Sequence, residues 1–182
     1  MHYLKRKKVI SWALYDWANS AFATTVMAGF FPLFFKSFWA ADLSPAESTA
    51  VIGTTNSLAG LFIMLSAPIL GAYSDLGKLK KKFLAFFALL GVLSTGYLYF
   101  IPQGDWVIAA SLYALAVVGF SGGNIFYDSL IVSVSKQEQR HKVSSLGFSM
   151  GYLGGGLLFV INVLMYLLIL AMVNRRYRTS ST

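Results

Sequence analysis

An apolar segment near the start of the chain, SWALYDWANSAF at 11–22, is interrupted by a carboxylate, an amide and a hydroxyl. At 100° per helical residue, Asp16, Asn19 and Ser20 lie on one face, with Thr24 a turn further along its edge. A carboxylate in lipid costs on the order of several kcal/mol, so this face should turn toward a bundle interior or a water-filled cavity. There a carboxylate can take up and release a proton or attract a cationic group of a ligand.

A second apolar segment repeats this arrangement, with Ser121, Asn124 and Asp128 at spacings of three and four residues. Its aspartate falls toward the same side of the membrane as Asp16, so we expect the two carboxylates to flank one cavity. The alternative is that each aspartate lies at a helix end and is hydrogen-bonded to backbone. This alternative stays open, above all for Asp128, which lies nearest the membrane edge.

Two Tyr-Asp pairs, Tyr15-Asp16 and Tyr127-Asp128, also raise the alternative of an intramembrane aspartyl protease, because paired carboxylates can share a proton and activate water. The only Gly-Asp pair, at 104–105, lies in an expected outer loop, away from both segments. We therefore expect that the chain is not an enzyme. The lack of cysteine excludes disulfides and thiolate metal sites. We expect no cofactor and no metal, while coupling to a proton or another ion stays open.

The elements that position these groups are membrane-spanning helices. Hydrophobic residues make up 57% of the 182 residues and charged residues only 12%, against roughly 25% in soluble domains. A hydrocarbon core of about 30 Å needs roughly 20 apolar residues in a helix. Five such runs predict an all-α membrane protein, with Pro32 and Pro68 expected to bend the first two spans. The expected spans are 9–35, 49–73, 83–101, 106–132 and 146–173.

The distribution of Lys and Arg predicts the orientation, because positively charged short loops stay in the cytoplasm. These residues cluster at 5–8, 78–82 and 136–142, whereas the loops 40–48 and 102–105 contain none. We therefore expect a cytoplasmic N-terminus and an uncleaved first span. With five spans, the basic tail 174–182 then falls outside, against the preference of Lys and Arg for the cytoplasm. We therefore expect either that the last span does not cross the membrane or that the parent chain continues. The net charge of +8 comes from these short clusters, which excludes a nucleic-acid surface.

Three further patterns concern helix ends and helix packing. In LSPAES, Ser44 is expected as the N-cap of a helix, with Pro45 at its first position and Glu47 reaching back. Asp75 is expected to cap the next helix or to pair with a neighbouring cation. The small-residue ridge at i, i+4 and i+8 in the fifth span is expected to let another helix approach closely, or to bind a partner protein. It consists of Gly147, Gly151 and Gly155. Trp12 is expected near the inner membrane interface.

The loop after the second span resembles the loop between spans two and three of major facilitator superfamily transporters. The resemblance is carried by Gly71, Asp75, Gly77 and the lysines from Lys78 onward. In addition, YDWANSAF in the first span and RHKVSSLGFSMGYLGGG at 140–156 are similar to the branch related to the vacuolar amino-acid effluxers of autophagy. The resemblance covers nearly the whole chain up to about Tyr166. The loop of this chain departs from the usual one in two ways. Asp75 and Gly77 are one residue closer together, and Lys stands in place of the usual Arg.

The resemblance implies a twelve-span fold of two half-bundles that rock to give alternating access. It makes residues 1–173 the N-terminal half-bundle of a permease or effluxer in a bacterial inner membrane, moving a small polar solute such as an amino acid. It places Asp16, Asn19, Ser20, Asn124 and Asp128 beside the path, and it makes the loop at 71–78 a gate. The expected partners are lipid, the solute and a missing C-terminal half-bundle, since a truncated or frameshifted transporter is expected.

Overall fold

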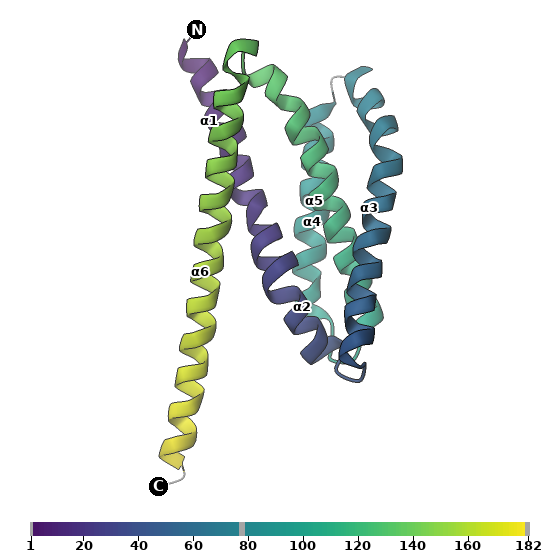
Figure 1. The fold of residues 1–182 in the computed structure, drawn as a ribbon, viewed down its shortest axis with the longest axis vertical. Coiled ribbons are helices and arrows are strands. Elements are labelled where there is room, and N and C mark those ends of the chain that lie inside the picture. The colour runs from purple at the N-terminus through teal and green to yellow at the C-terminus, as the bar shows by residue number, and fades with distance from the viewer. Residues whose placement is uncertain (1, 77–78, 181–182) are drawn as a thin grey trace.

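The computed structural model describes the backbone of residues 2–76 and 79–180 and the side chains of residues 6–75 and 79–172. Within these residues the fold is entirely helical, and five helices are long and apolar enough to cross a membrane (Figure 1). The five spans extend over Arg6–Trp39, Pro45–Asp75, Lys80–Phe100, Trp106–Val134 and Gln137–Met172. The all-α prediction is therefore confirmed. Most of these spans run a few residues beyond the expected ones, because a helix satisfies its own backbone while charged side chains at its ends reach water.

The first span is built from four consecutive helical pieces. It begins with α1, His2–Ala21, and continues through η1, Phe22–Phe30, α2, Phe31–Phe34, and η2, Phe35–Trp39. Both η segments are π-helical, and the amide of Phe31 donates to the carbonyl of Val26 five residues earlier. Pro32 follows directly, and a proline lacks an amide donor and crowds the carbonyl of the preceding turn. The wider turns thus accommodate Pro32 without ending the helix.

The second span is α3, Pro45–Leu76, and its start confirms the expected capping box. The amide of Ser44 donates to Glu47 Oε2 at 2.9 Å, and the amide of Glu47 donates to Ser44 Oγ at 3.3 Å. These two bonds satisfy backbone donors that a helix N-terminus otherwise leaves unpaired.

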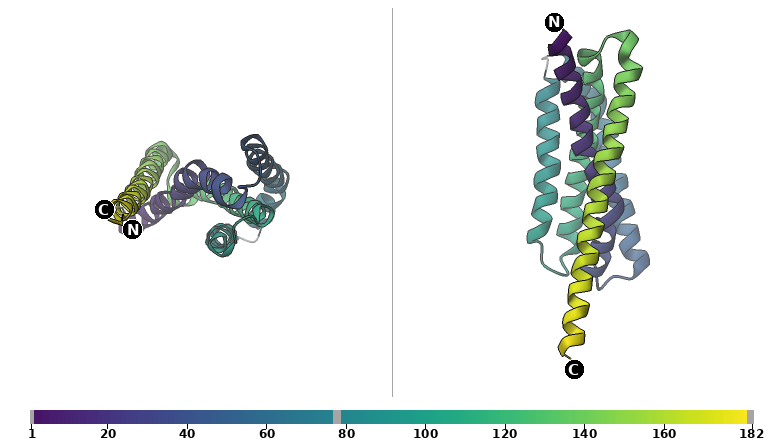
Figure 2. Two further views of the ribbon diagram at one scale, coloured as in Figure 1. Left: turned by 90° about the horizontal axis from the view of Figure 1, so that it is seen from below. Right: turned by 90° about the vertical axis from the view of Figure 1, so that its left-hand side faces the viewer.

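The remaining spans are α4, Lys80–Tyr97, with η3, Leu98–Phe100; α5, Trp106–Val134; and α6, Arg140–Ser180, which follows η4, Gln137–Gln139. Helix α5 lies in the middle and packs against α4, α3 and α1, whereas α6 packs mainly along α1. Figure 2 shows α6 running past the end of the other helices, with the two chain termini at opposite ends. The tail at 174–180 continues α6 as a helix.

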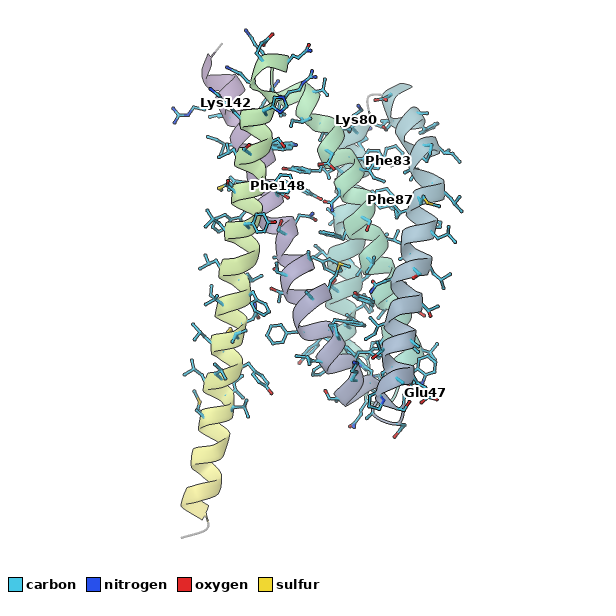
Figure 3. The ribbon with its side chains drawn as sticks, in the orientation of Figure 1. Glu47, Lys80, Phe83, Phe87, Lys142 and Phe148 are labelled. Carbon is cyan, nitrogen blue, oxygen red and sulfur yellow. The ribbon has the colours of Figure 1, made fainter. Side chains whose placement is uncertain are left out.

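Aromatic side chains form much of the packed interior. Phe83 and Phe87 of α4 both stack on Phe126 of α5, with ring centroids 5.1 and 5.8 Å apart (Figure 3). Near the far end of the bundle, Phe31 stacks on Tyr113 at 3.8 Å. These contacts fix α4 and the end of the first span against α5, while α1 packs directly along α6.

Candidate functional site

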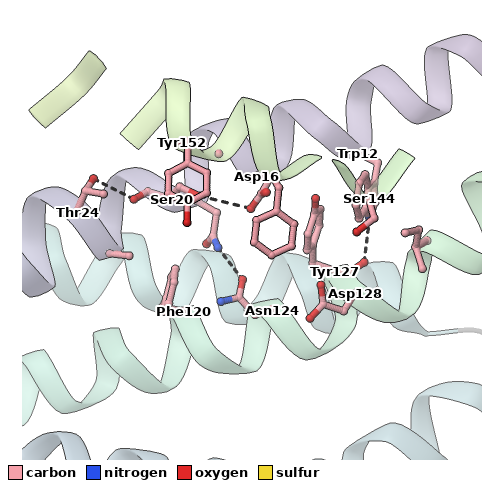
Figure 4. Close-up of a pocket in the computed structure, with 15 residues that line it drawn as sticks. Trp12, Asp16, Ser20, Thr24, Phe120, Asn124, Tyr127, Asp128, Ser144 and Tyr152 are labelled. Atoms are coloured by element: carbon pink, nitrogen blue, oxygen red, sulfur yellow. Dashed lines mark hydrogen bonds between the residues drawn. The ribbon is translucent and has the colours of Figure 1, made fainter. Parts of the chain in front are cut away.

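A cavity of about 540 Å³ lies between α1, α5 and α6 (Figure 4). Its volume falls within the range of roughly 300–1,000 Å³ that is usual for small-molecule sites. All five residues that were expected beside a path line this one cavity. The lining consists of Trp12, Asp16, Asn19, Ser20, Ala23, Thr24, Phe120, Asn124, Tyr127, Asp128, Ile131, Ser144, Phe148, Gly151 and Tyr152.

The cavity contains two carboxylates from different helices. Asp16 on α1 is half-buried, and Asp128 on α5 is more exposed to the cavity. The hydroxyl of Ser20 donates to Asp16 Oδ1 across 3.5 Å, which is a long hydrogen bond. Among the described residues that line the cavity, none is Lys, Arg or His. The cavity is therefore an acidic site within the membrane-spanning part of the chain.

An amide bridge joins two walls of the cavity. Asn19 Nδ2 on α1 donates to Asn124 Oδ1 on α5 at 2.7 Å. One turn further along the first span, in η1, Thr24 Oγ1 donates to the carbonyl of Ser20 and to the carbonyl of Gly155 on α6, both at 3.1 Å. Polar contacts therefore hold the first span to both of its neighbours at the depth of the cavity.

An aromatic wall closes the end of the cavity nearest the N-terminus. Trp12 stacks on Tyr127 with ring centroids 4.4 Å apart, and its Nε1 donates to the Tyr127 carbonyl at 3.0 Å. Tyr15 stacks on the same tyrosine at 5.2 Å. Trp12 is thus buried against α5 and forms part of the cavity wall. Sequence reasoning missed this packing role, because an indole near a basic cluster is equally typical of an interfacial anchor.

Glycines on α6 allow this helix to approach α1. A Cβ atom at Gly151 would lie 2.7 Å from Ser20 Oγ and 2.8 Å from Asp16 Oδ2. One at Gly147 would meet the ring of Trp12 at 2.6 Å, and one at Gly155 would meet Thr24 Oγ1 at 2.9 Å. The ridge is covered by α1, so it is not free to bind a partner protein as the alternative required. Gly154, which the i, i+4 pattern did not include, meets the backbone and ring of Trp17 in the same way.

The expected gating loop lies apart from the cavity. Asp75 forms an ion pair with Lys80, with Oδ1 and Nζ 2.6 Å apart, across the turn between α3 and α4. Leu79 is the N-cap of α4 and gives no side-chain cap bond, so of the two expected roles for Asp75 the structure shows pairing. Gly71 lies within α3 with open space beside it. Gly77 and Lys78 lie outside the described residues.

Long apolar helices around a polar cavity define an integral membrane protein of the helical-bundle class. Within the described part of the chain, no three acidic or histidine side chains gather as metal ligands would. The sequence family described as "Vacuole effluxer Atg22 like" matches residues 44–134, and the chain belongs to this family. The match covers α3, α4 and almost all of α5, including Asn124 and Asp128.

Two relatives match most of the chain. It is 42% identical over 163 residues to the "Uncharacterized MFS-type transporter YxiO" of Bacillus subtilis (strain 168), a match that covers 89% of this chain and 38% of the relative. It is 27% identical over 159 residues to an "Uncharacterized protein" of Aquifex aeolicus (strain VF5), covering 86% and 38%. No solved structure matches. The chain thus spans about 38% of the length of both relatives. A relative named as a transporter agrees with the expectation that the chain is not an enzyme, and it disfavours the aspartyl-protease alternative.

Proposed function

We propose that this chain forms part of a secondary transporter, and that the cavity between α1, α5 and α6 lies on the path of a small polar solute. The observation that carries the proposal is that Asp16, Asn19, Ser20, Asn124 and Asp128, which come from two distant segments, all line that single cavity. Ionisable groups inside a membrane are costly and usually mark a pathway for solutes or ions. The amino acids suggested by the family are one class of such solute.

Alternating access requires a second body on the other side of the path. The most apolar part of α5 is 50% buried, whereas that of the other four spans is only 6 to 17% buried. We infer that the exposed faces of these four spans meet lipid and further helices, and that the helices are supplied in the relatives by the part of their length that this chain does not match. The partner is then a C-terminal half-bundle.

The orientation proposed from the sequence is a cytoplasmic N-terminus in a bacterial inner membrane. Lys80 and Lys142 lie at the end of the bundle that holds the N-terminus, and Glu47 lies at the opposite end (Figure 3). This separation of charge supports the orientation, because basic residues favour the cytoplasmic side. The Asp75–Lys80 pair lies at the same basic end, where a gate between α3 and α4 would act.

The test is solute uptake in proteoliposomes with an imposed pH gradient, by a fusion in which this chain replaces the matching part of the Bacillus subtilis relative, so that the rest of the relative supplies the second half-bundle. Amino acids and small organic ammonium compounds are offered as radiolabelled solutes. We expect uptake of at least one of them above that of empty vesicles, reduced at least tenfold in Asp16→Asn. Asp42→Asn is the matched control, because Asp42 is an exposed loop residue away from the cavity. A folded fusion that takes up neither class of solute, or an Asp16→Asn variant with unchanged flux and pH dependence, would overturn the proposal.

A further inference from the structure

We propose that the cavity between α1, α5 and α6 selects an organic cation, namely a solute that carries an ammonium group on an apolar body. The proposal deepens the transport function proposed above and rests on it, because it names the class of solute for the same site. It differs from the amino-acid expectation in one respect: a zwitterion has a carboxylate that this cavity is poorly built to receive.

Both charged side chains among the described residues that line the cavity are negative. Helix α1 contributes Asp16 and helix α5 contributes Asp128, while the residues that α6 contributes are uncharged. Arg140, one turn before Ser144 on α6, does not line the cavity. Two carboxylates in a water-poor space favour a positive ligand and oppose a negative one. The carboxylate of an amino acid would find no cationic side chain among the described lining residues.

Aromatic side chains from all three helices surround the same space. Trp12 comes from α1, Phe120 and Tyr127 from α5, and Phe148 and Tyr152 from α6. The Trp12 and Tyr127 rings are fixed by their stacking and by the hydrogen bond from the indole. In contrast, Phe148 and Tyr152 are 66% and 77% exposed, so packing within this chain constrains them less. Aromatic faces within about 6 Å of an ammonium group attract it through their quadrupole.

A buried hydroxyl gives the second, independent indication of a ligand. Tyr127 is only 5% exposed, it lines the cavity, and its hydroxyl has no hydrogen-bond partner among the described residues. Figure 4 shows it beside Asp16 and Asp128. A buried hydroxyl without a partner is uncommon. The N–H of a primary ammonium ion would supply that partner by donating to the Tyr127 oxygen, which a quaternary ammonium ion cannot do.

The test compares compounds that share a phenylethyl or benzyl body and differ in charge: phenethylammonium, phenylalanine and phenylacetate. Binding to the purified chain in detergent is measured by equilibrium dialysis of the radiolabelled compounds. We expect phenethylammonium to bind at least tenfold more tightly than phenylalanine, and phenylacetate to show no saturable binding. Asp16→Asn and Asp128→Asn should each weaken the cation at least tenfold, whereas Asp42→Asn and Asp105→Asn, outside the cavity, should not.

Tyr127→Phe separates a specific contact from a general loss of structure. It should weaken phenethylammonium several-fold and leave phenethyl-trimethylammonium unchanged, because only the primary ion can donate to the hydroxyl. Equal or tighter binding of phenylalanine or phenylacetate, or equal effects of Tyr127→Phe on both cations, would overturn the inference. Cation binding without flux in proteoliposomes would leave this inference standing and overturn the proposed transport. Flux of amino acids without cation binding would overturn this inference and leave the proposed transport standing.

Discussion

Two close helix contacts in this molecule, one at Gly119 and one at Gly151, differ in what the glycine faces. Between α4 and α5, a Cβ atom at Gly119 would lie 2.7 Å from the Cα atom of Gly91 and 2.7 Å from the Phe87 carbonyl. Between α1 and α6, one at Gly151 would meet the ends of two polar side chains, Ser20 and Asp16. The first contact is backbone against backbone, and the second is backbone against side chains that line the cavity.

The difference indicates which part of the bundle is fixed and which can adjust. Backbone atoms in two packed helices cannot move apart without separating the helices, whereas the ends of side chains can change rotamer. Helix α5 is packed on several sides, and α6 mainly along α1. We conclude that α4 and α5 form the scaffold and that the cavity-lining part of α1 and α6 around Gly151 forms the adjustable side of the molecule. Close by on α6, Gly154 meets the backbone of Trp17, which fixes the two helices together there.

The largest effect is expected from Gly119→Ala, which should destabilise the chain by about 3 kcal/mol or prevent folding. The added methyl group overlaps backbone atoms of α4, and overpacking that cannot relax typically costs roughly 1–3 kcal/mol or more. The measurement is chemical unfolding in detergent micelles followed by circular dichroism. The control is Gly96→Ala on α4, where the added methyl meets nothing within 4 Å. A Gly119→Ala variant as stable as this control would break the scaffold assignment.

A smaller effect on stability, but a large one on the cavity, is expected from Gly151→Ala. Its methyl group displaces the side chains of Ser20 and Asp16, so we expect a loss of about 1 kcal/mol in stability and at least tenfold weaker binding of phenethylammonium. Gly156→Ala is the matched control, because it lies on the same helix in open space. If Gly151→Ala destabilised the protein as much as Gly119→Ala, the contacts at these two glycines would not differ as described.

The amide bridge between Asn19 and Asn124 sharpens the comparison, because it joins the adjustable side to the scaffold. A double-mutant cycle with Asn19→Ala and Asn124→Ala should give a coupling energy of about 0.5–1.5 kcal/mol, the range for interhelical hydrogen bonds. The quantity to measure is the free energy of unfolding of the two single variants and the double variant. Additive effects of the two substitutions would show that the bridge does not couple α1 to α5.

The sequence predicts the five spans and the membrane fold because long apolar runs leave few alternatives. It also predicts which polar residues share a face, since helical periodicity places Asp16, Asn19 and Ser20 together. It does not predict which helices pack together. The contact between Trp12 and Tyr127, the partner of Asp75 and the part played by Gly154 depend on tertiary packing, and no local pattern distinguishes them.

The smallest effect is expected at the Asp75–Lys80 ion pair, which lies outside both helix pairs. Its side chains are 65% and 31% exposed, and exposed pairs contribute roughly 0–1 kcal/mol. Each charge also lies at the unfavourable end of its own helix dipole, Asp75 at the end of α3 and Lys80 at the start of α4, so the pair mainly offsets that cost. Lys80→Met should therefore change the unfolding free energy by less than about 1 kcal/mol.

Lys81→Met is the control for the ion pair, since Lys81 is an exposed neighbour on the same helix. Any difference between the two variants should shrink as salt is raised, because salt screens exposed charges. A difference above about 1 kcal/mol, or one that salt does not reduce, would mean that the turn between α3 and α4 belongs to the scaffold. A change in transport rate at unchanged stability would instead assign the pair to the adjustable side of the molecule, because a gate must be able to move.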